Sequence, residues 1–264
     1  MQELDKGCYS GNIIDKYTGD GLICCHTSYH EQRFNGVRHF HQNAHLSLVL
    51  SGNCAEKKRE TYYRQPGHVT FYHAGEAHQV LNVSRFSRHI NLEIEPMIFD
   101  QFNLLEQNIN MAIQNSPDTG FLLLQLHREM QIKDDCTALS IQSAFLQLVC
   151  GTAGIINRND LPVWVRRTGE YLRDNVSTKI TLSALSVAAG AHPVTISKYF
   201  KKYWGCTLGQ HMRKLKIERS LPLIKSEKHT LAEVAFTCGF ADQSHFIRAF
   251  KECTGVLPTF YQEI

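Results

Sequence analysis

The sequence lacks any long hydrophobic run. Its longest apolar stretches, such as "FLLLQL" at 121–126, are far shorter than the roughly 20 residues that cross a membrane. The opening "MQELDKGCYS" contains no apolar stretch of the kind found in signal peptides. We therefore expect a cytoplasmic protein without a membrane partner. Its 264 residues suffice for one large domain or two ordinary ones.

The nine cysteines lack any pairing pattern. No CxxC pair occurs, and the adjacent Cys24 and Cys25 suit neither an ordinary disulfide nor the spacing of a zinc site. Without an export signal, these cysteines are expected to be reduced thiols. We assign them no metal-binding or redox role.

Positive charge is scarce in the first part of the chain. Residues 1–159 contain 13 Lys and Arg against 16 Asp and Glu, whereas residues 160–264 contain 15 against 9. A basic block of this kind is typical of proteins that bind a polyanion such as nucleic acid. Ten of the 14 histidines lie before residue 160, so histidine chemistry is expected in the acidic part.

The N-terminal part predicts a small β-barrel or sandwich followed by helices. Between residues 40 and 95, short segments alternate polar with apolar side chains and are separated by turn sequences. Three helical segments follow, at 97–113, 118–132 and 136–156. The third places apolar side chains near one face, which packs on the barrel or pairs with a second copy of the chain; this face holds Leu139, Gln142, Phe145, Leu146 and Val149.

The basic part contains an internal repeat. "LSALSVAAG" (182–190) and "LAEVAFTCG" (231–239) share their length and their Leu and Gly ends, and each precedes a helical pattern, "ISKYFK" or "FIRAFK". Gly190 and Gly239 are 49 residues apart, and Gly205 and Gly255 are 50 apart. Each copy reads as an amphipathic helix, a glycine turn and a second amphipathic helix, which is the pattern of a helix-turn-helix unit.

The second helix of each copy has a predicted core face and a predicted exposed face. The core faces hold Ile196, Tyr199 and Phe200 in copy one, and Phe246, Ala249 and Phe250 in copy two. The exposed faces are short, polar and cationic, as in helices that read a major groove. They hold Val194, Thr195, Ser197, Lys198 and Lys201, then Gln243, Ser244, His245, Ile247, Arg248 and Lys251. Paired helices with merely solvated charges are the alternative, but the basic block and the duplication favour double-stranded DNA as partner.

The repeat resembles the signature of the AraC/XylS family of bacterial transcription regulators, most closely in "GFADQSHFIRAFK" (239–251), over about 165–261. The resemblance implies two helix-turn-helix units joined by a long helix, here 207 to about 221. It implies base and phosphate contacts by Val194, Thr195, Ser197 and Lys198, and by Gln243, Ser244, His245 and Arg248. The sequence departs from the family pattern at Ser186, at His192, where a weaker helix cap is expected, and at Pro222, where the long helix should kink or end.

The N-terminal histidines lie in two segments, "HFHQNAHLSLVLSG" (39–52) and "GHVTFYHAGEAHQVLN" (67–82), which resemble the two motifs of the cupin barrel. That resemblance implies that His39, His41, His45 (in place of a Glu) and His78 form one site. Imidazoles bind divalent transition metals well. Three interpretations stay open: a metal site, a pocket for a small organic effector, and purely structural histidines. The sequence does not orient Arg38, Arg64 or Arg88, which are candidate groups for an anionic effector.

Together these features predict a two-domain α+β protein. A cupin-like effector-binding and dimerisation domain at 1–157 (barrel about 10–95, helices about 97–156) precedes an AraC-type DNA-binding domain at 158–264. The expected function is a sequence-specific transcription regulator without catalytic activity, controlled by a small-molecule effector. A homodimer is expected, with RNA polymerase as a candidate partner. The alternatives are a metal-dependent cupin enzyme with an accessory helical domain, and a constitutive DNA-binding protein without effector.

Overall fold

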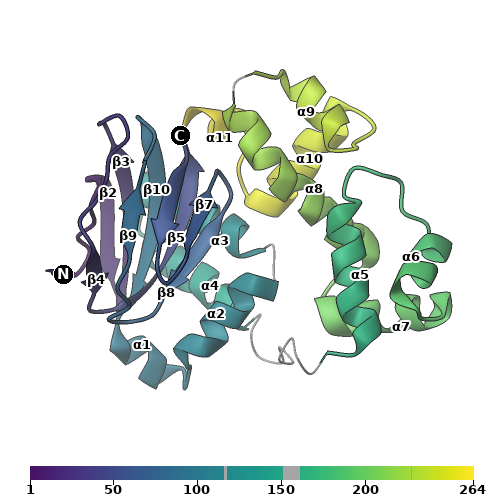
Figure 1. The fold of residues 1–264 in the computed structure, drawn as a ribbon, viewed down its shortest axis with the longest axis horizontal. Helices are drawn as coiled ribbons and strands as arrows, with labels where there is room; N and C mark the ends of the chain where they lie inside the picture. Colours follow the sequence, from purple (N-terminus) through teal and green to yellow (C-terminus); the bar gives the residue numbers. More distant parts are fainter. Residues whose placement is uncertain (116–117, 151–160, 227) are drawn as a thin grey trace.

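A computed structural model describes residues 1–115, 118–150, 161–226 and 228–264 (Figure 1). Within these ranges the strands all lie before residue 95, in a β domain that we define as residues 1–95. They are β1 (Gln2–Leu4), β2 (Asn12–Gly19), β3 (Leu22–Tyr29), β4 (His39–His41), β5 (Ala44–Ser51), β6 (Cys54–Lys57), β7 (Thr61–Arg64), β8 (Val69–Tyr72), β9 (Gln79–Leu81) and β10 (Ser87–Ile94). The sequence pattern predicted short strands between residues 40 and 95, where β5 to β10 lie, and it did not identify β1, β2 or β3.

The strands form a large sheet, a small sheet and a short pair. The large antiparallel sheet has the order β2-β3-β10-β5-β8, the small one β7-β6-β9, and β1 pairs in parallel with β4. Side chains alternate between the two faces of a strand. Leu46 and Leu48 of β5 therefore join the hydrophobic core on the helix-covered face, whereas His45 and Ser47 line a polar interior. The polar interior is the part of the β domain that holds the histidines.

Four helices follow the β domain: α1 (Pro96–Gln101), α2 (Glu106–Asn115), α3 (Asp118–Ile132) and α4 (Thr137–Cys150). The predicted single helix at 97–113 is wrong, because the chain leaves α1 at Phe102 and passes through Asn103 in the left-handed region (φ 49°) before α2 begins. Helix α3 contacts β2, β3 and β10 and packs along α4. The predicted extension of the third helix to residue 156, and the proposed domain boundary at 157/158, lie outside the described residues.

The apolar stripe of α4 packs within the chain. Phe145 and Val149 are buried in the main core, and Leu146 packs against it. Leu139, by contrast, is 69% exposed. Of the two arrangements left open by the sequence, the described part of the chain shows internal packing for most of this stripe. Charged substitutions at Leu146 and Val149 would therefore disturb the fold before they could report on dimerisation.

The C-terminal part is helical throughout its described residues. It comprises α5 (Val163–Asp174), α6 (Leu182–Ala189), α7 (Pro193–Trp204), α8 (Leu208–Lys225), α9 (Leu231–Thr237), α10 (Gln243–Thr254) and α11 (Pro258–Glu263). Helix α8 runs through Pro222 and ends three residues later, so of the kink or end expected at this proline, the end does not occur. The proline has no N–H to donate within the helix, but Ser226 N–H donates to Pro222 O at 3.1 Å and closes the last turn.

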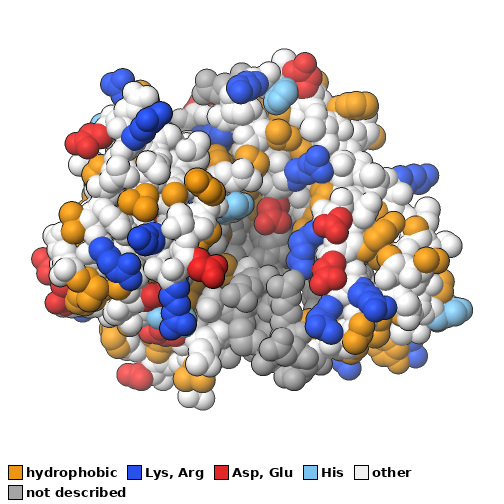
Figure 2. Space-filling view, viewed as in Figure 1, with side chains coloured by type: hydrophobic (Ala, Val, Ile, Leu, Met, Phe, Trp, Pro, Cys, Tyr) orange, Lys and Arg blue, Asp and Glu red, His pale blue; other side chains and the backbone are white. Residues whose placement is uncertain are grey.

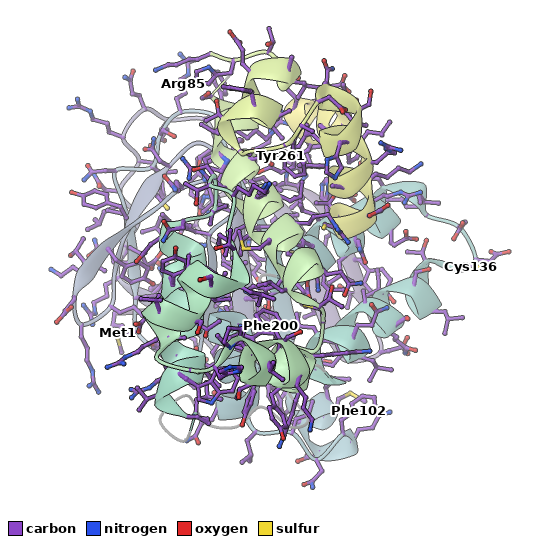
Figure 3. All side chains as sticks on the ribbon, turned by 90° about the vertical axis from the view of Figure 1, so that its right-hand side faces the viewer. Met1, Arg85, Phe102, Cys136, Phe200 and Tyr261 are labelled. Carbon is purple, nitrogen blue, oxygen red and sulfur yellow. The ribbon has the colours of Figure 1, made fainter. Side chains whose placement is uncertain are left out.

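These helices belong to two hydrophobic cores. Helices α5, α6 and α7 pack around Leu172, Leu185 and Phe200 in a core of their own. Helices α9, α10 and α11 join the main core, which also includes the helix-covered face of the large sheet. Helix α8 contributes to both, and Figure 3 shows Phe200 toward one end of this helix and Tyr261 toward the other. The second helical unit is therefore built onto the β domain, whereas the first has a separate interior.

No described helix combines the length and the hydropathy that a bilayer-spanning segment needs.

Candidate DNA-binding face and histidine cluster

The sequence repeat is a structural repeat. Helix α6 leads into α7, and α9 leads into α10, with a glycine in the left-handed region at each turn: Gly190 (φ 66°) and Gly239 (φ 76°). A Cβ at Gly239 would lie 2.7 Å from the backbone oxygen of Ser177, a distance that a real side chain could not keep. The turn thus requires glycine both for its conformation and for close backbone approach.

The N-termini of α7 and α10 are capped differently. Asp242 accepts a hydrogen bond from His245 N–H at 2.7 Å, as is typical of an acidic cap. At the equivalent position in the first unit, the His192 ring nitrogen accepts from Val194 N–H at 3.3 Å. The cap at His192 thus forms, with a longer hydrogen bond than that of Asp242.

Helix α7 presents most of its predicted face to solvent. Ile196 and Phe200 are buried as expected, but Tyr199 is 39% exposed, so its prediction as a core residue is wrong. The helix turns Tyr199 to the edge between the two faces, where Lys198 Nζ lies 5.4 Å from the centre of its ring. Of the predicted DNA-contacting side chains on α7, Thr195 is half-buried and the following are exposed: Val194, Ser197, Lys198 and Lys201.

Helix α10 keeps its predicted division more closely. Phe246, Ala249 and Phe250 are buried, while Gln243, Ser244, Arg248 and Lys251 are exposed. His245 and Ile247 are half-buried at the edges, and the His245 ring packs edge-on against Phe240 at 5.3 Å between centroids. The space-filling view shows Lys and Arg side chains over the surface of the C-terminal helices, toward the right (Figure 2). Both helices thus offer polar and cationic side chains on one face, as major-groove recognition requires.

Three of the four predicted histidines converge in the β domain. One ring nitrogen from each of His39, His41 and His78 lies within 4.8 Å of the others, and all three side chains are buried. An antiparallel bridge between His39 and His78 brings the two sequence motifs together. The Nδ1 atoms of these two residues lie 2.8 Å from Val37 O and 3.0 Å from Glu76 O. If each Nδ1–H donates to its carbonyl, Nε2 is left with a free lone pair.

His45 is the fourth predicted member, and it does not share this set of ligand atoms. Its ring stacks on Tyr72 at 4.4 Å, with an angle of 9° between the planes, and lies 4.3 Å from the His41 ring. His45 stands on β5, which belongs to the large sheet, whereas His39 and His41 stand on β4, which pairs with β1. The expected four-histidine set is therefore corrected to three histidines with His45 beside them.

These imidazoles are held neutral. Burial, with a contribution from the neighbouring histidines, lowers the pKa of His41 to about 3. Burial likewise lowers the pKa of His78 to about 3 and lowers the pKa of His39 and of His45. A neutral imidazole is the form that binds metals. The Nδ1 atoms of His41 and His45 are buried and have no hydrogen-bond partner among the described residues.

The site therefore fits a metal better than it fits an organic molecule. Imidazole nitrogens that bind one metal at about 2.0–2.1 Å lie roughly 3.3 Å apart, so nitrogens now within 4.8 Å of one another would move inward to hold it. The cavity beside them has a volume of about 20 Å³. A single water needs roughly 10–15 Å³, whereas a drug-sized ligand needs several hundred. The orphaned buried nitrogen of His41, the neutral imidazoles and a cavity of ionic size all match one bound ion.

The same interior contains a buried ion pair that the sequence did not orient. Arg64 donates to Ser47 O at 2.7 Å and to Tyr72 Oη at 3.2 Å, and its Nη1 lies 3.5 Å from Glu56 Oε2. Burial raises the pKa of Glu56, and the Arg64 charge opposes that effect. Arg88 instead donates to Glu263 O, outside this interior.

Residues 185–264 match the family model described as a helix-turn-helix domain. Relatives include the HTH-type transcriptional activator Btr of Bacillus subtilis (strain 168), 27% identical over 221 residues that cover 80% of this chain and 41% of that protein. The HTH-type transcriptional activator RhaR of Mannheimia succiniciproducens is 21% identical over 240 residues, which cover 85% of this chain and 86% of that protein. The chain spans less than half the length of the first curated relatives that it matches.

Among solved structures, ToxT from Vibrio cholerae is similar to 92% of this chain and 98% of its own, with 12% identity and a TM-score of 0.39. The chain thus contains a helix-turn-helix domain over residues 185–264 and is similar, over most of its length, to proteins named as transcriptional activators.

Proposed function

We propose that the protein is a sequence-specific, DNA-binding regulator of transcription, with an AraC-type DNA-binding domain over 158–264. The observation that carries this proposal is the duplicated helix pair, whose second helices α7 and α10 both have exposed polar and cationic faces. The match to a helix-turn-helix model and the names of the relatives support it. Each recognition helix would enter a major groove of one double-stranded DNA.

The DNA-binding proposal is tested with the purified full-length chain. Sequences selected from a random double-stranded library should converge on one motif. The affinity for that motif should fall steeply with added salt, because phosphate contacts release counterions. Arg248→Ala removes an exposed guanidinium of α10 and should weaken specific binding by about tenfold or more, if Arg248 reads a base. Arg166→Ala, on the exposed surface of α5, is the matched control. Selection without a common motif would contradict the proposal.

The β domain, on this proposal, is a cupin-like sensor that holds a divalent transition metal at His39, His41 and His78. Support comes from the convergence of the three rings and the ion-sized cavity. The same cavity argues against a metal-dependent cupin enzyme, since it leaves no room for an organic substrate beside the ion.

Metal content tests this part separately. The purified chain, loaded with Co²⁺, should show the visible absorption of a tetrahedral or five-coordinate imidazole site with one metal per chain. His41→Ala should abolish that spectrum, whereas His30→Ala, at an exposed histidine outside the three-histidine cluster, should retain it. An equal metal content in His41→Ala and the unaltered chain would overturn the metal proposal and leave the DNA-binding proposal intact.

A further inference from the structure

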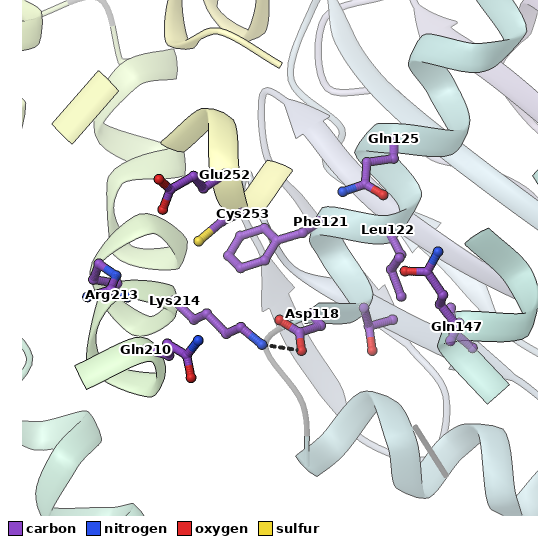
Figure 4. Close-up of a pocket in the computed structure, with 12 residues that line it drawn as sticks. Asp118, Phe121, Leu122, Gln125, Gln147, Gln210, Arg213, Lys214, Glu252 and Cys253 are labelled. Carbon is purple, nitrogen blue, oxygen red and sulfur yellow. Dashed lines mark hydrogen bonds and ion pairs between the residues drawn. The ribbon is translucent and has the colours of Figure 1, made fainter. Parts of the chain in front are cut away.

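A crevice of about 390 Å³ lies between the two parts of the chain (Figure 4). One wall comes from α3 and α4, next to the β domain. The other wall comes from α8 and α10 of the helix-turn-helix part. The crevice has about the volume of a small-ligand pocket, unlike the cavity at the histidines. An organic molecule bound there would touch both parts of the chain at once.

The walls of the crevice carry two positive and two negative side chains. Arg213 and Lys214 stand on α8, Asp118 at the start of α3, and Glu252 on α10. Lys214 Nζ lies 2.6 Å from Asp118 Oδ2, and this ion pair joins the two walls. In the described parts of the chain, neither Arg213 nor Glu252 forms a salt bridge. The lining thus has no net charge, but it holds one cation and one carboxylate that are free to pair with a ligand.

The floor of the crevice is apolar and its rim is rich in amides. Phe121, Leu122 and Leu148 are buried and face the hollow, and Figure 4 shows the Phe121 ring and the Lys214 chain pointing into the same space. The amide side chains around them are Gln125, Gln147 and Gln210. An apolar side chain of a ligand would cover the Phe121 ring, and amides would hydrogen-bond to its polar end.

We propose that this crevice binds a zwitterion of the α-amino-acid class with an apolar side chain. The ligand carboxylate lies at Arg213 and the ligand ammonium group at Glu252, on the side of the crevice away from the ion pair of Lys214 with Asp118 (Figure 4). A simple organic anion would pair with Arg213 and bring a second negative charge beside the exposed Glu252 carboxylate. A zwitterion instead makes a charge-assisted contact at each end.

Binding at this crevice would regulate DNA binding, a consequence that rests on the proposed function. Arg213 and Glu252 also line a neighbouring hollow together with His245 and Arg248 of the proposed DNA-contacting face. A ligand that contacts α8, α10 and α3 together would change how readily α10 can enter a major groove of DNA. Such coupling is reciprocal, so bound DNA would change the ligand affinity by the same factor.

The test measures binding to the full-length protein by calorimetry and by thermal shift, with L-leucine and L-phenylalanine as probes. At least one should raise the melting temperature. L-leucinamide and 3-methylbutylamine lack the carboxylate, and 4-methylpentanoate lacks the ammonium group. Each of these analogues of leucine should bind about tenfold or more weakly, because each loses a charge-assisted contact.

Variants locate the site. Arg213→Gln and Glu252→Gln should each weaken binding of the amino acid by about tenfold or more, while Arg166→Gln on the exposed face of α5 should bind as the unaltered chain does. The proposal is overturned if neither amino acid binds, if leucine and leucinamide bind equally, or if Arg213→Gln binds the amino acid as tightly as the unaltered chain does. If no amino acid binds but Arg248→Ala still loses a selected DNA motif, only this inference fails. If leucine binds through Arg213 but no DNA motif can be selected, the proposed function fails and the ligand site stands.

Discussion

The two helical units, which contain the pairs α6–α7 and α9–α10, share one sequence pattern but have different surroundings. The second unit shares the main core with the β domain: Phe250 is fully buried there, and Tyr261 donates a hydrogen bond to Leu50 O of β5 at 3.2 Å. Arg128 adds a hydrogen bond from α3 to Gly255 O at 3.0 Å. The first unit packs around Phe200 in its own core.

The difference shows which unit can respond to the β domain. A change in the large sheet acts directly on the second unit through shared packing. It reaches the first unit through α8, which contributes to both cores, and through the close approach of Ser177 to Gly239. The two units are also capped differently, since α9 begins with a reciprocal capping box between Thr230 and Glu233, whereas α6 has the single Thr181 cap. The two units thus share a local sequence pattern, but only the second shares a hydrophobic core with the β domain.

The largest expected difference between the two cores is in their loss of stability at low pH. Burial lowers the pKa of His26 to about 3 and of His127 to about 4, at the contact between β3 and α3. Because these folded-state values lie below the roughly 6.5 of a free imidazole, the unfolded chain binds more protons, so stability is lost as the pH falls below about 6.5. Each of these histidines lowers the free energy of unfolding by up to about 1.4 kcal/mol per pH unit. Over a fall of two pH units, the two histidines together lower it by up to about 5 kcal/mol.

The core of the first unit contains one such group, His211, whose pKa burial lowers to about 4. Both tryptophans, Trp164 and Trp204, pack against that core and report on it by fluorescence. In a pH series, loss of far-UV circular dichroism should therefore begin at a higher pH than the change in tryptophan fluorescence. If tryptophan fluorescence changed at a higher pH than the circular dichroism, the main core would not be the less acid-stable of the two.

Matched substitutions of phenylalanine by alanine should show whether the two cores unfold separately. Phe250→Ala and Phe200→Ala each remove a buried ring and should cost about 3–5 kcal/mol. Phe250→Ala should lower the melting of the β domain and the second unit together. Phe200→Ala should shift the tryptophan transition alone. Calorimetry combined with fluorescence distinguishes them, and a single shared transition in both variants would show that the two cores are one cooperative unit.

Tyr261→Phe tests the polar contact that ties the second unit to β5. It leaves the ring in place and removes the donor to Leu50 O, so the buried carbonyl loses its partner at a cost of about 1–2 kcal/mol. Tyr63→Phe, at an exposed tyrosine, is the control and should be neutral. Denaturant unfolding measures the stability of both variants. Equal stability would show that this hydrogen bond does not stabilise the contact between the second unit and the sheet.

The smallest effect is expected at the caps. His192→Ser places a stronger capping residue before α7 and should stabilise the first unit by about 0.5 kcal/mol, whereas Asp242→Ala should destabilise α10 by about 1 kcal/mol. Hydrogen exchange at the first turn of each helix measures the two changes. A destabilised α7 in His192→Ser would show that the imidazole makes contacts beyond its cap.

Much of the local structure was predictable because the signals are local. Gly190 and Gly239 predicted turns, since a positive φ favours glycine wherever it occurs, and the spacing of Phe246 and Phe250 predicted the buried face of α10. The same reasoning failed where tertiary contacts overrule the pattern. Tyr199 has helical spacing for a core position but stands at an edge, and Pro222 sits within α8 although prolines usually end helices.

For the candidate sites, sequence alone determined which chemical groups are available: a histidine-rich N-terminal part, a basic C-terminal part and two copies of a helix pair. It could not determine that His45 stands aside while His39, His41 and His78 converge, because convergence depends on how β4 pairs across the domain. Only the tertiary structure brought Asp118 to Lys214, 96 residues apart, and made a crevice between them. Spacing along a chain governs turns and helices, whereas contacts between distant segments depend on how whole elements pack.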